Sequence, residues 1–156
     1  MKRSSHRNPR QLEVIARGLL ISRHGILACR PKSRINCYLP GGHVEFGEPA
    51  SLALEREMME ELGIAAKAGK FLGTHEQAFL QGGIQHHEIN LYFKMTAPAL
   101  STAKVLISHE DHIEFFWLKS GEMAEVNLLP VVSRRMILRW KIREEIQFAS
   151  DGLPVI

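Results

Sequence analysis

Cysteine is scarce in this 156-residue sequence, and long apolar stretches are absent from it. The two cysteines, Cys29 and Cys37, form no Cys-x-x-Cys motif, and such sparse usage favours reduced thiols in a cytosolic protein over a disulfide framework. No apolar run approaches the roughly 20 residues of a membrane-spanning helix. The start of the chain lacks the apolar segment of a signal peptide, and it is too short and unpatterned for us to prefer an organelle transit peptide. We therefore predict a cytoplasmic protein without a membrane segment.

A strong charge of either sign is also missing. The formal net charge is +3 and the pI is near 9.0, which is compatible with an anionic ligand but falls short of a nucleic-acid-binding composition. The basic residues that precede the first acid, Glu13, are Lys2, Arg3, Arg7 and Arg10. We expect residues 1–12 to form a flexible basic tail and residues 13–156 to form a single domain. The alternative for the tail is an arm that closes over an anionic substrate.

Internal repeats and low-complexity segments are absent, and the apolar pattern is that of a mixed fold. Apolar, β-branched and alternating residues predict strands at 13–22, 26–31, 67–76, 86–96 and 113–119. Within the fourth of these, Ile89, Leu91 and Phe93 alternate on one side of the strand. A Gly-Gly pair at 82–83 predicts the turn between the third and fourth strands.

Three segments are predicted to be helical. Residues 49–62 place Pro at the first helical position, an apolar stripe on one face (Ala50, Leu54, Met58 and Leu62) and Gly63 at the end. We expect a short helix at 120–129 and a longer one at 130–149, whose inner stripe is Leu138, Ile142 and Ile146. This order of elements predicts an α/β (α+β) fold, with helices packed on a mixed β-sheet.

The helix at 49–62 carries an unusual concentration of negative charge. Glu57, Glu60 and Glu61 are spaced at i, i+3 and i+4, which places three carboxylates on one helical face. Lysine is absent from 33 to 66, and acids near a helix C-terminus oppose the helix dipole. An exposed Glu-rich face is the simpler interpretation, but a hard divalent cation such as Mg²⁺ or Mn²⁺ would remove both penalties. We therefore predict a metal site on this face.

The Gly-rich loop before the helix completes a known motif. Gly42, five residues, Glu48, seven residues and then the run Arg56 to Ile64 (REMMEELGI) match every specified position of the Nudix box. The sequence thus resembles the Nudix (MutT-like) hydrolase family from about residue 13 to about residue 145. The resemblance implies an α/β/α sandwich with a loop-helix-loop metal site. It also implies hydrolysis of the pyrophosphate bond in a nucleoside diphosphate linked to another group X.

The resemblance also implies roles for individual residues. Glu57, Glu60 and Glu61 match the metal-binding glutamates, and Glu60 or Glu61 is our candidate for the catalytic base. The backbone carbonyl of Gly42 matches a further metal ligand. The residues that match structural supports of the site are Arg56, Glu48 and Gly63.

Residues outside the box are weaker candidates. Glu110 or Asp111, in the loop before the strand at 113–119, could supply another acidic ligand or base, as related proteins often do, although a solvated turn explains them too. His109 and His112 have too few partners for a zinc site. The side chains that could contact the substrate are Arg30, His86, His87 and Glu88, and those that could stack on a base are Tyr38, Phe46 and Phe79.

We predict that the protein is a nucleotide pyrophosphatase. Two other functions compete with this prediction. One competitor is a binding or regulatory module that retains the fold without catalysis, although such a module usually loses a box glutamate and none is lost here. The other is an RNA-binding or cap-cleaving protein, suggested by the basic N-terminus. The residues leave the substrate open between nucleotide sugars or ADP-ribose and (d)NTPs. They also leave the oligomeric state open, and the family resemblance favours a homodimer because dimers are frequent in the family.

Overall fold

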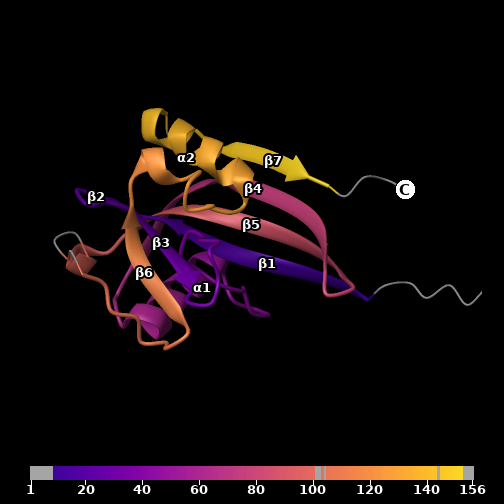
Figure 1. The fold of residues 1–156 in the computed structure, drawn as a ribbon, viewed down its shortest axis with the longest axis horizontal. Helices are drawn as coiled ribbons and strands as arrows, with labels where there is room; N and C mark the ends of the chain where they lie inside the picture. The colour runs from indigo at the N-terminus through magenta and orange to yellow at the C-terminus, as the bar shows by residue number, and fades with distance from the viewer. Residues whose placement is uncertain (1–8, 101–102, 104, 144, 153–156) are drawn as a thin grey trace, which may run out of the picture.

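Two β-sheets lie between two helices in the computed structural model (Figure 1). The structure describes residues 9–100, 103, 105–143 and 145–152. The helices are α1 (Ala50–Leu62) and α2 (Val131–Ile142). The strands are β1 (Arg10–Leu19), β2 (Ile21–Ser22), β3 (Gly25–Pro31), β4 (Lys67–Gln81), β5 (Ile84–Thr96), β6 (Ile113–Leu118) and β7 (Gln147–Asp151). No helix in these described ranges is long and apolar enough to cross a membrane.

The larger sheet is mixed, as the order of elements predicts. Its strand order is β1-β5-β4-β7, with β1 parallel to β5, β4 antiparallel to β5, and β7 parallel to β4. The smaller antiparallel sheet has the order β2-β3-β6. One apolar cluster joins α1 to β1, β3 and β6, and a second joins α2 to both sheets. The predicted α/β (α+β) fold with a mixed sheet is confirmed.

Helix α1 is confirmed almost to the residue. Leu54, Met58 and Leu62 are buried on the predicted stripe. Pro49 is the N-cap rather than the first helical residue, a difference of one position. Gly63 ends the helix in the left-handed conformation, with φ 64°, and its N–H donates to the Met59 carbonyl at 2.9 Å.

The hairpin of β4 and β5 is longer than the sequence pattern predicts. Gly82 and Gly83 both have positive φ, 58° and 80°, as a tight two-residue hairpin turn requires. The strands continue through polar residues up to this turn, so alternation of apolar residues does not mark their ends. Asn90, Tyr92 and Met95 are the fully buried residues of β5, whereas the predicted face of Ile89, Leu91 and Phe93 is half-buried. A central strand has neighbours on both faces, which explains this difference.

The predicted helix at 130–149 is wrong beyond Ile142. Residues 147–151 form β7 by pairing with the open edge of β4, a long-range contact that local periodicity cannot reveal. The predicted inner stripe is also wrong, because Leu138, Ile142 and Ile146 are 46%, 83% and 69% exposed. The buried face is instead built from Val132, Ser133, Met136, Ile137 and Trp140.

Trp140 explains which face of α2 turns inward. Its ring lies 5.2 Å from that of Tyr92, and its indole N–H donates to the Leu72 carbonyl at 2.9 Å.

The short helix predicted at 120–129 is reduced to one 3₁₀ turn, Ser120–Glu122, and is followed by turns. Strand β1 begins three residues earlier than predicted, so Arg10 belongs to the sheet; residues 1–8 of the predicted tail lie outside the described residues.

Candidate active site

The loop before α1 is fixed along the outer edge of β1. The N–H of Ala16 donates to the Gly42 carbonyl at 2.9 Å, and the N–H of Val44 donates to the Val14 carbonyl at 2.9 Å. The Gly42 carbonyl, a predicted metal ligand, therefore has one lone pair in use and one remaining. A Cβ on Gly42 would lie 2.3 Å from Cδ of Glu57, so glycine leaves room there for the Glu57 carboxylate.

Arg56 ties the loop and helix together. Its Nε donates to Glu48 at 2.9 Å, and its Nη1 donates to Glu57 at 3.0 Å and to Glu60 at 2.9 Å. Its Nη2 also donates to the His43 carbonyl at 3.1 Å. The Arg56 guanidinium lowers the pKa of the Glu48 carboxyl through this contact. One cation thus holds three of the clustered carboxylates.

Glu61 is the carboxylate that Arg56 does not hold. Its side chain points to the buried side of α1 and the residue is only 7% exposed. Its Oε2 is buried and has no hydrogen-bond partner among the described residues. Burial, together with the charges of Glu57 and Glu110, raises the pKa of Glu61 to about 7, and Arg17 opposes this shift. A buried carboxylate that lacks a partner is unfavourable unless it is protonated or meets a cation.

The loop before β6 closes on the C-terminal end of α1. The His109 N–H and the Ser108 hydroxyl donate to the Glu61 carbonyl at 2.7 and 3.2 Å. A Cβ on Gly63 would lie 2.1 Å from Cε1 of His109, so Gly63 serves both this contact and the left-handed cap. The loop brings the Glu110 charge close enough to affect Glu61, whereas Asp111 is exposed.

The carboxylate and carbonyl oxygens of this site fit a hard divalent cation. In the described part of the chain, no three His, Cys, Asp or Glu side chains already converge as a coordination shell. The unpartnered Glu61 oxygen nevertheless lies among like charges, and a cation would favour its ionised form. Carboxylate and carbonyl oxygens are the ligands that Mg²⁺ and Mn²⁺ prefer. His112 lies 3.3 Å from Glu110 and His109 packs on Gly63, and the described residues around them offer no further ligand for zinc.

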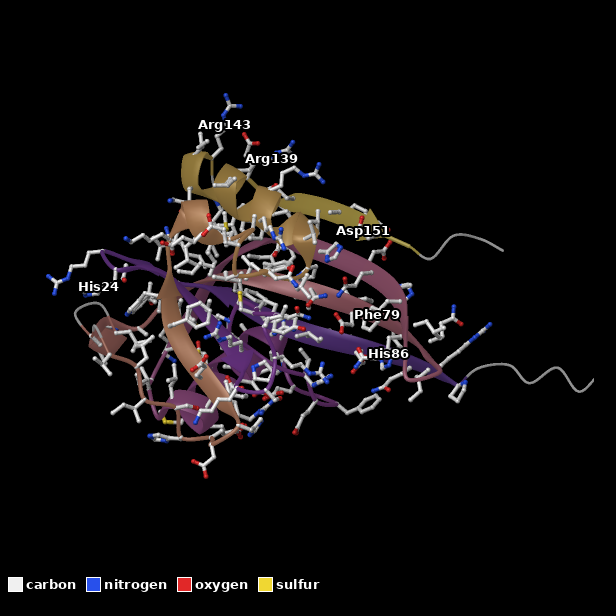
Figure 2. The ribbon with its side chains drawn as sticks, viewed as in Figure 1. His24, Phe79, His86, Arg139, Arg143 and Asp151 are labelled. Atoms are coloured by element: carbon white, nitrogen blue, oxygen red, sulfur yellow. The ribbon has the colours of Figure 1, made fainter. Side chains whose placement is uncertain are left out.

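A polar cleft of about 380 Å³ lies on the face of the larger sheet that α2 also covers. This volume is within the usual range for a small-molecule site. Its lining comes from separate segments: Arg17, Arg34, Asn36, Tyr38, Gln77, Phe79, Gln81, Glu88, Leu129, Pro130, Val131 and Asp151. Tyr38 and Phe79 supply aromatic rings, and Glu88 and Asp151 supply hydrogen-bond acceptors. Figure 2 shows Phe79 near the β4–β5 turn and Asp151 at the end of β7.

The comparisons with known proteins agree with this architecture. A family model described as the NUDIX domain matches residues 12–140. The chain belongs to the NUDIX family. The recognised family and its hydrolase class are thereby confirmed, while no curated protein matches the sequence.

Solved structures share the Nudix fold at low sequence identity. A MutT protein from Bacillus halodurans is 13% identical, with a TM-score of 0.65 over 90% of this chain and 89% of that one. The E. coli ORF135 protein is 22% identical, with a TM-score of 0.60 over 85% of this chain and 92% of that one. An ADP-ribose pyrophosphatase from Streptococcus suis is 11% identical, with a TM-score of 0.57 over 89% and 98%.

The predicted substrate contacts of this Nudix protein divide between the cleft and other surfaces. Tyr38, Phe79 and Glu88 line the cleft, whereas Phe46 is fully exposed on the loop before α1. Arg30 is held by Glu114 on the neighbouring strand β6 and is not among the cleft residues. His87 is exposed beside Glu76.

His86 lies behind the cleft wall. Its Nδ1 is 2.9 Å from Glu13, and its ring stacks on Phe79 with centroids 5.0 Å apart (Figure 2). Glu13 also contacts His43 at 2.9 Å. Burial raises the pKa of Glu13, but the contacts with His86 and His43 together outweigh burial and lower that pKa. His86 therefore positions an aromatic wall of the cleft.

Sequence reasoning missed several cleft residues, among them Arg17, Gln77 and Asp151. No motif marks them, because they come from β1, β4 and β7. Strand register groups them on one face of the larger sheet. Gln77 pairs with both Glu88 and Asp151, and Arg17 pairs with Tyr92, which lies an even number of residues from Glu88 on β5.

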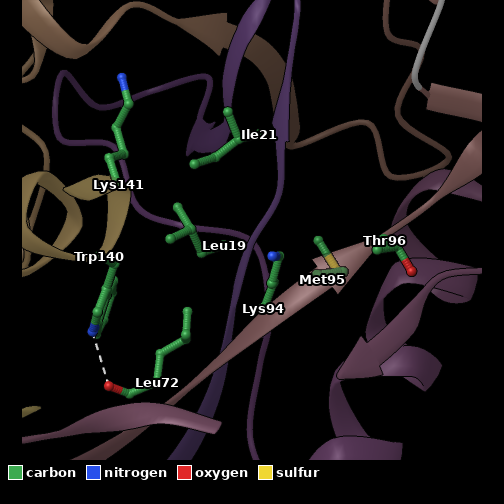
Figure 3. Close-up of a pocket in the computed structure, with 8 residues that line it drawn as sticks. All are labelled: Leu19, Ile21, Leu72, Lys94, Met95, Thr96, Trp140 and Lys141. Atoms are coloured by element: carbon green, nitrogen blue, oxygen red, sulfur yellow. Dashed lines mark hydrogen bonds between the residues drawn. The ribbon is translucent and has the colours of Figure 1, made fainter. Parts of the chain in front are cut away.

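A further cavity, of about 420 Å³, lies between the end of β5 and α2 (Figure 3). Its lining is mainly apolar, with Lys94 and Lys141 at its edge and the Trp140–Leu72 hydrogen bond in its wall. None of the lining residues is a carboxylate, so this cavity does not share the chemistry of the Nudix site.

Proposed function

We propose that the protein uses a divalent metal ion to hydrolyse the pyrophosphate bond of a nucleoside diphosphate linked to a group X, giving NMP and phosphorylated X. The buried, unpartnered oxygen of Glu61 among Glu57, Glu60 and Glu110 carries this proposal. X is a sugar, as in ADP-ribose or a nucleotide sugar, or a phosphate, as in a (d)NTP. The adjacent cleft accepts the nucleoside.

The residues that would hold Mg²⁺ or Mn²⁺ are Glu57, Glu60, Glu61, the Gly42 carbonyl and Glu110. When bound, the metal supplies neutralisation of the phosphoryl oxygens and a lower pKa for the attacking water. Arg56 keeps Glu57 and Glu60 in place through direct hydrogen bonds, and Glu48 anchors Arg56. Neutralisation matters because a pyrophosphate repels an anionic nucleophile.

Glu61 and Glu60 are the candidates for the general base. Glu61 is favoured because its Oε2 has no hydrogen-bond partner among the described residues, whereas Arg56 already donates to the Glu60 carboxylate. Its free Oε2 would accept the proton of the attacking water. The water oxygen bonds to one of the two phosphorus atoms, the bond from that phosphorus to the bridging oxygen breaks, and the bridging oxygen leaves on the other phosphate. The products are NMP and phosphorylated X.

The names of two structural neighbours agree with this substrate class. One is the ADP-ribose pyrophosphatase described above, and another is a UDP-X diphosphatase that is 18% identical, with a TM-score of 0.57 over 94% of this chain and 69% of that one. Both names describe nucleoside diphosphates with an attached group. A homodimer and a cytoplasmic location stay predictions.

A substrate panel tests the proposed function. ADP-ribose, UDP-glucose and the four NTPs are incubated with the protein in Mg²⁺, in Mn²⁺ and in EDTA, and the products are identified by phosphorus NMR. We expect cleavage between the phosphorus atoms in either metal and none in EDTA. Binding of these compounds without cleavage would instead favour a binding module, and cleavage that persists in EDTA would contradict a metal-dependent reaction.

A further inference from the structure

Arg17 occupies a distinctive position outside the Nudix box. It lies on β1 and lines the cleft. Its Nη1 donates to the Leu39 carbonyl at 3.2 Å, and its Nε donates to Oδ1 of Asn90 at 3.3 Å. Its guanidinium carbon lies 5.5 Å from the centroid of the Tyr38 ring. These three contacts hold the guanidinium in one orientation.

The partner of Arg17 on β5 is itself fixed. Asn90 is fully buried, and its amide nitrogen donates to Glu88 at 3.3 Å. The same Glu88 oxygen accepts a hydrogen bond from Gln77 at 2.6 Å. Because its amide group is committed to Glu88, Asn90 presents its carbonyl oxygen to Arg17. The carboxylate of Glu88 therefore orients Arg17 indirectly and does not neutralise it.

Arg17 differs from the other arginines near the site in the charge of its partners. Arg56 and Arg30 each contact a carboxylate. Among the described residues, every hydrogen-bond and ring partner of Arg17 is neutral: a carbonyl, an amide and an aromatic ring. A half-buried cation whose direct partners are all neutral carries a desolvation cost that an anionic ligand in direct contact would offset.

The location of this cation between two sites suggests which anion it binds. Arg17 borders the cleft that would accept the nucleoside, and its positive charge is also felt by Glu61 on α1. In a nucleoside diphosphate, the phosphoryl group that joins these two regions is the one attached to the nucleoside. Guanidinium groups bind phosphoryl oxygens through short, charge-assisted hydrogen bonds.

We propose that Arg17 binds the phosphoryl group attached to the nucleoside and thereby fixes the substrate between the cleft and the glutamates. This inference rests on the proposed function and deepens it. Nη2 makes no hydrogen bond within the described chain, so it can donate to the phosphate without loss of the contacts to Leu39 and Asn90. Tyr38 supports the flat guanidinium on one side, and a lysine would not reproduce that arrangement.

Binding of matched ligands with and without the phosphate tests the proposal. Titration calorimetry in Mg²⁺ measures Kd for the NMP released from the best substrate and for the corresponding nucleoside. The variants are Arg17→Gln, which removes the charge, and Arg17→Lys, which keeps the charge but loses the planar fork. Arg139→Gln is the matched control, because Arg139 is exposed on α2 and points away from the strands (Figure 2).

We expect Arg17→Gln to weaken NMP binding about tenfold or more and to leave nucleoside binding within about twofold. The Kd of Arg17→Lys for NMP should lie between those of wild type and Arg17→Gln. If Arg17→Gln does not fold, Arg17→Lys is the variant that tests the proposal. Arg139→Gln should match wild type for both ligands. An equal loss for NMP and nucleoside, or no loss for either, would overturn the role of Arg17. If wild type hydrolyses none of the panel compounds, the proposed function itself fails.

Discussion

The carboxylate helix and the neighbouring cleft are built in opposite ways. The carboxylate site comes almost entirely from residues 42–63, and Arg56 alone joins Glu48, Glu57 and Glu60. The cleft needs β1, β4, β5, β7 and two loops before it exists. In the proposed function the first region places the reacting groups and the second selects the ligand, so changes in the two regions should alter different kinetic constants.

The largest effect is expected at Glu61. Glu61→Gln keeps the size of the side chain but removes the charge that would hold a metal or accept a proton. We expect turnover at saturating substrate and Mg²⁺ to fall by roughly 10²-fold or more, with a melting temperature that does not fall, because glutamine removes a charge whose burial is unfavourable. Glu125→Gln, at an exposed position outside the site, is the matched control. A rate for Glu61→Gln close to that of the control would remove Glu61 from the mechanism.

Gly42→Ala should separate activity from stability within the same region. Its new Cβ would overlap Glu57 Cδ at 2.3 Å and so displace the end of a flexible side chain, at little expense to the fold. Because small displacements of reacting groups are costly, we expect kcat to fall about tenfold or more while the urea midpoint hardly moves.

Gly63→Ala provides the contrast to that variant. Gly63 has φ 64° and its Cβ would strike the His109 ring, so the free energy of unfolding should fall by about 1 kcal/mol or more. If Gly42→Ala destabilised the protein as much as Gly63→Ala, Gly42 would have a mainly structural role.

A cleft substitution should act on binding rather than on chemistry. Phe79→Leu removes an aromatic wall that His86 supports by stacking. We expect KM to rise about threefold to tenfold with kcat nearly unchanged, because this contact is made equally in the ground and transition states. Phe46→Leu, the same change at a fully exposed ring, should leave KM unaltered. A larger rise in KM from Phe46→Leu would place the nucleoside outside the cleft.

The smallest effect is expected in the pH dependence of stability. Burial lowers the pKa of His75, on β4 below the cleft, although Asp151 at 3.1 Å opposes the shift. As the pH falls below the ordinary pKa of about 6.5, the folded protein therefore binds fewer protons at His75 than the unfolded chain does. Its contribution is fully present above that pH and is lost as the pH falls through the lowered folded pKa.

We expect the melting temperature of wild type to fall more steeply than that of His75→Gln between pH 7 and pH 5. Differential scanning calorimetry at fixed ionic strength measures both curves. Parallel curves for the two proteins would show that His75 titrates alike in the folded and unfolded states.

The sequence allowed the carboxylate region to be predicted because its interactions are local. Helical spacing places Glu57, Glu60 and Glu61 together. The eight positions between Glu48 and Arg56 let the Arg56 side chain extend back along the helix and bind the Glu48 carboxylate just before its first turn. The C-terminal segment illustrates the opposite case. Leu138 and Ile142 are apolar at helical spacing, yet Trp140 turns another face inward, and β7 pairs with residues of β4 that are 74 positions earlier in the sequence (Gly73 with Gln147).

The family, helix α1 and the identity of the clustered acids could be read from local sequence, since they depend on residues within a few helical turns of one another. The folded chain was needed to show that the Glu61 Oε2 is buried without a hydrogen-bond partner among the described residues and that the Glu110 charge acts on Glu61. The tertiary structure alone also revealed Arg17 as a cation with neutral partners at the edge of the cleft. Those features depend on strand register and on loop closure between remote segments, which no local spacing encodes.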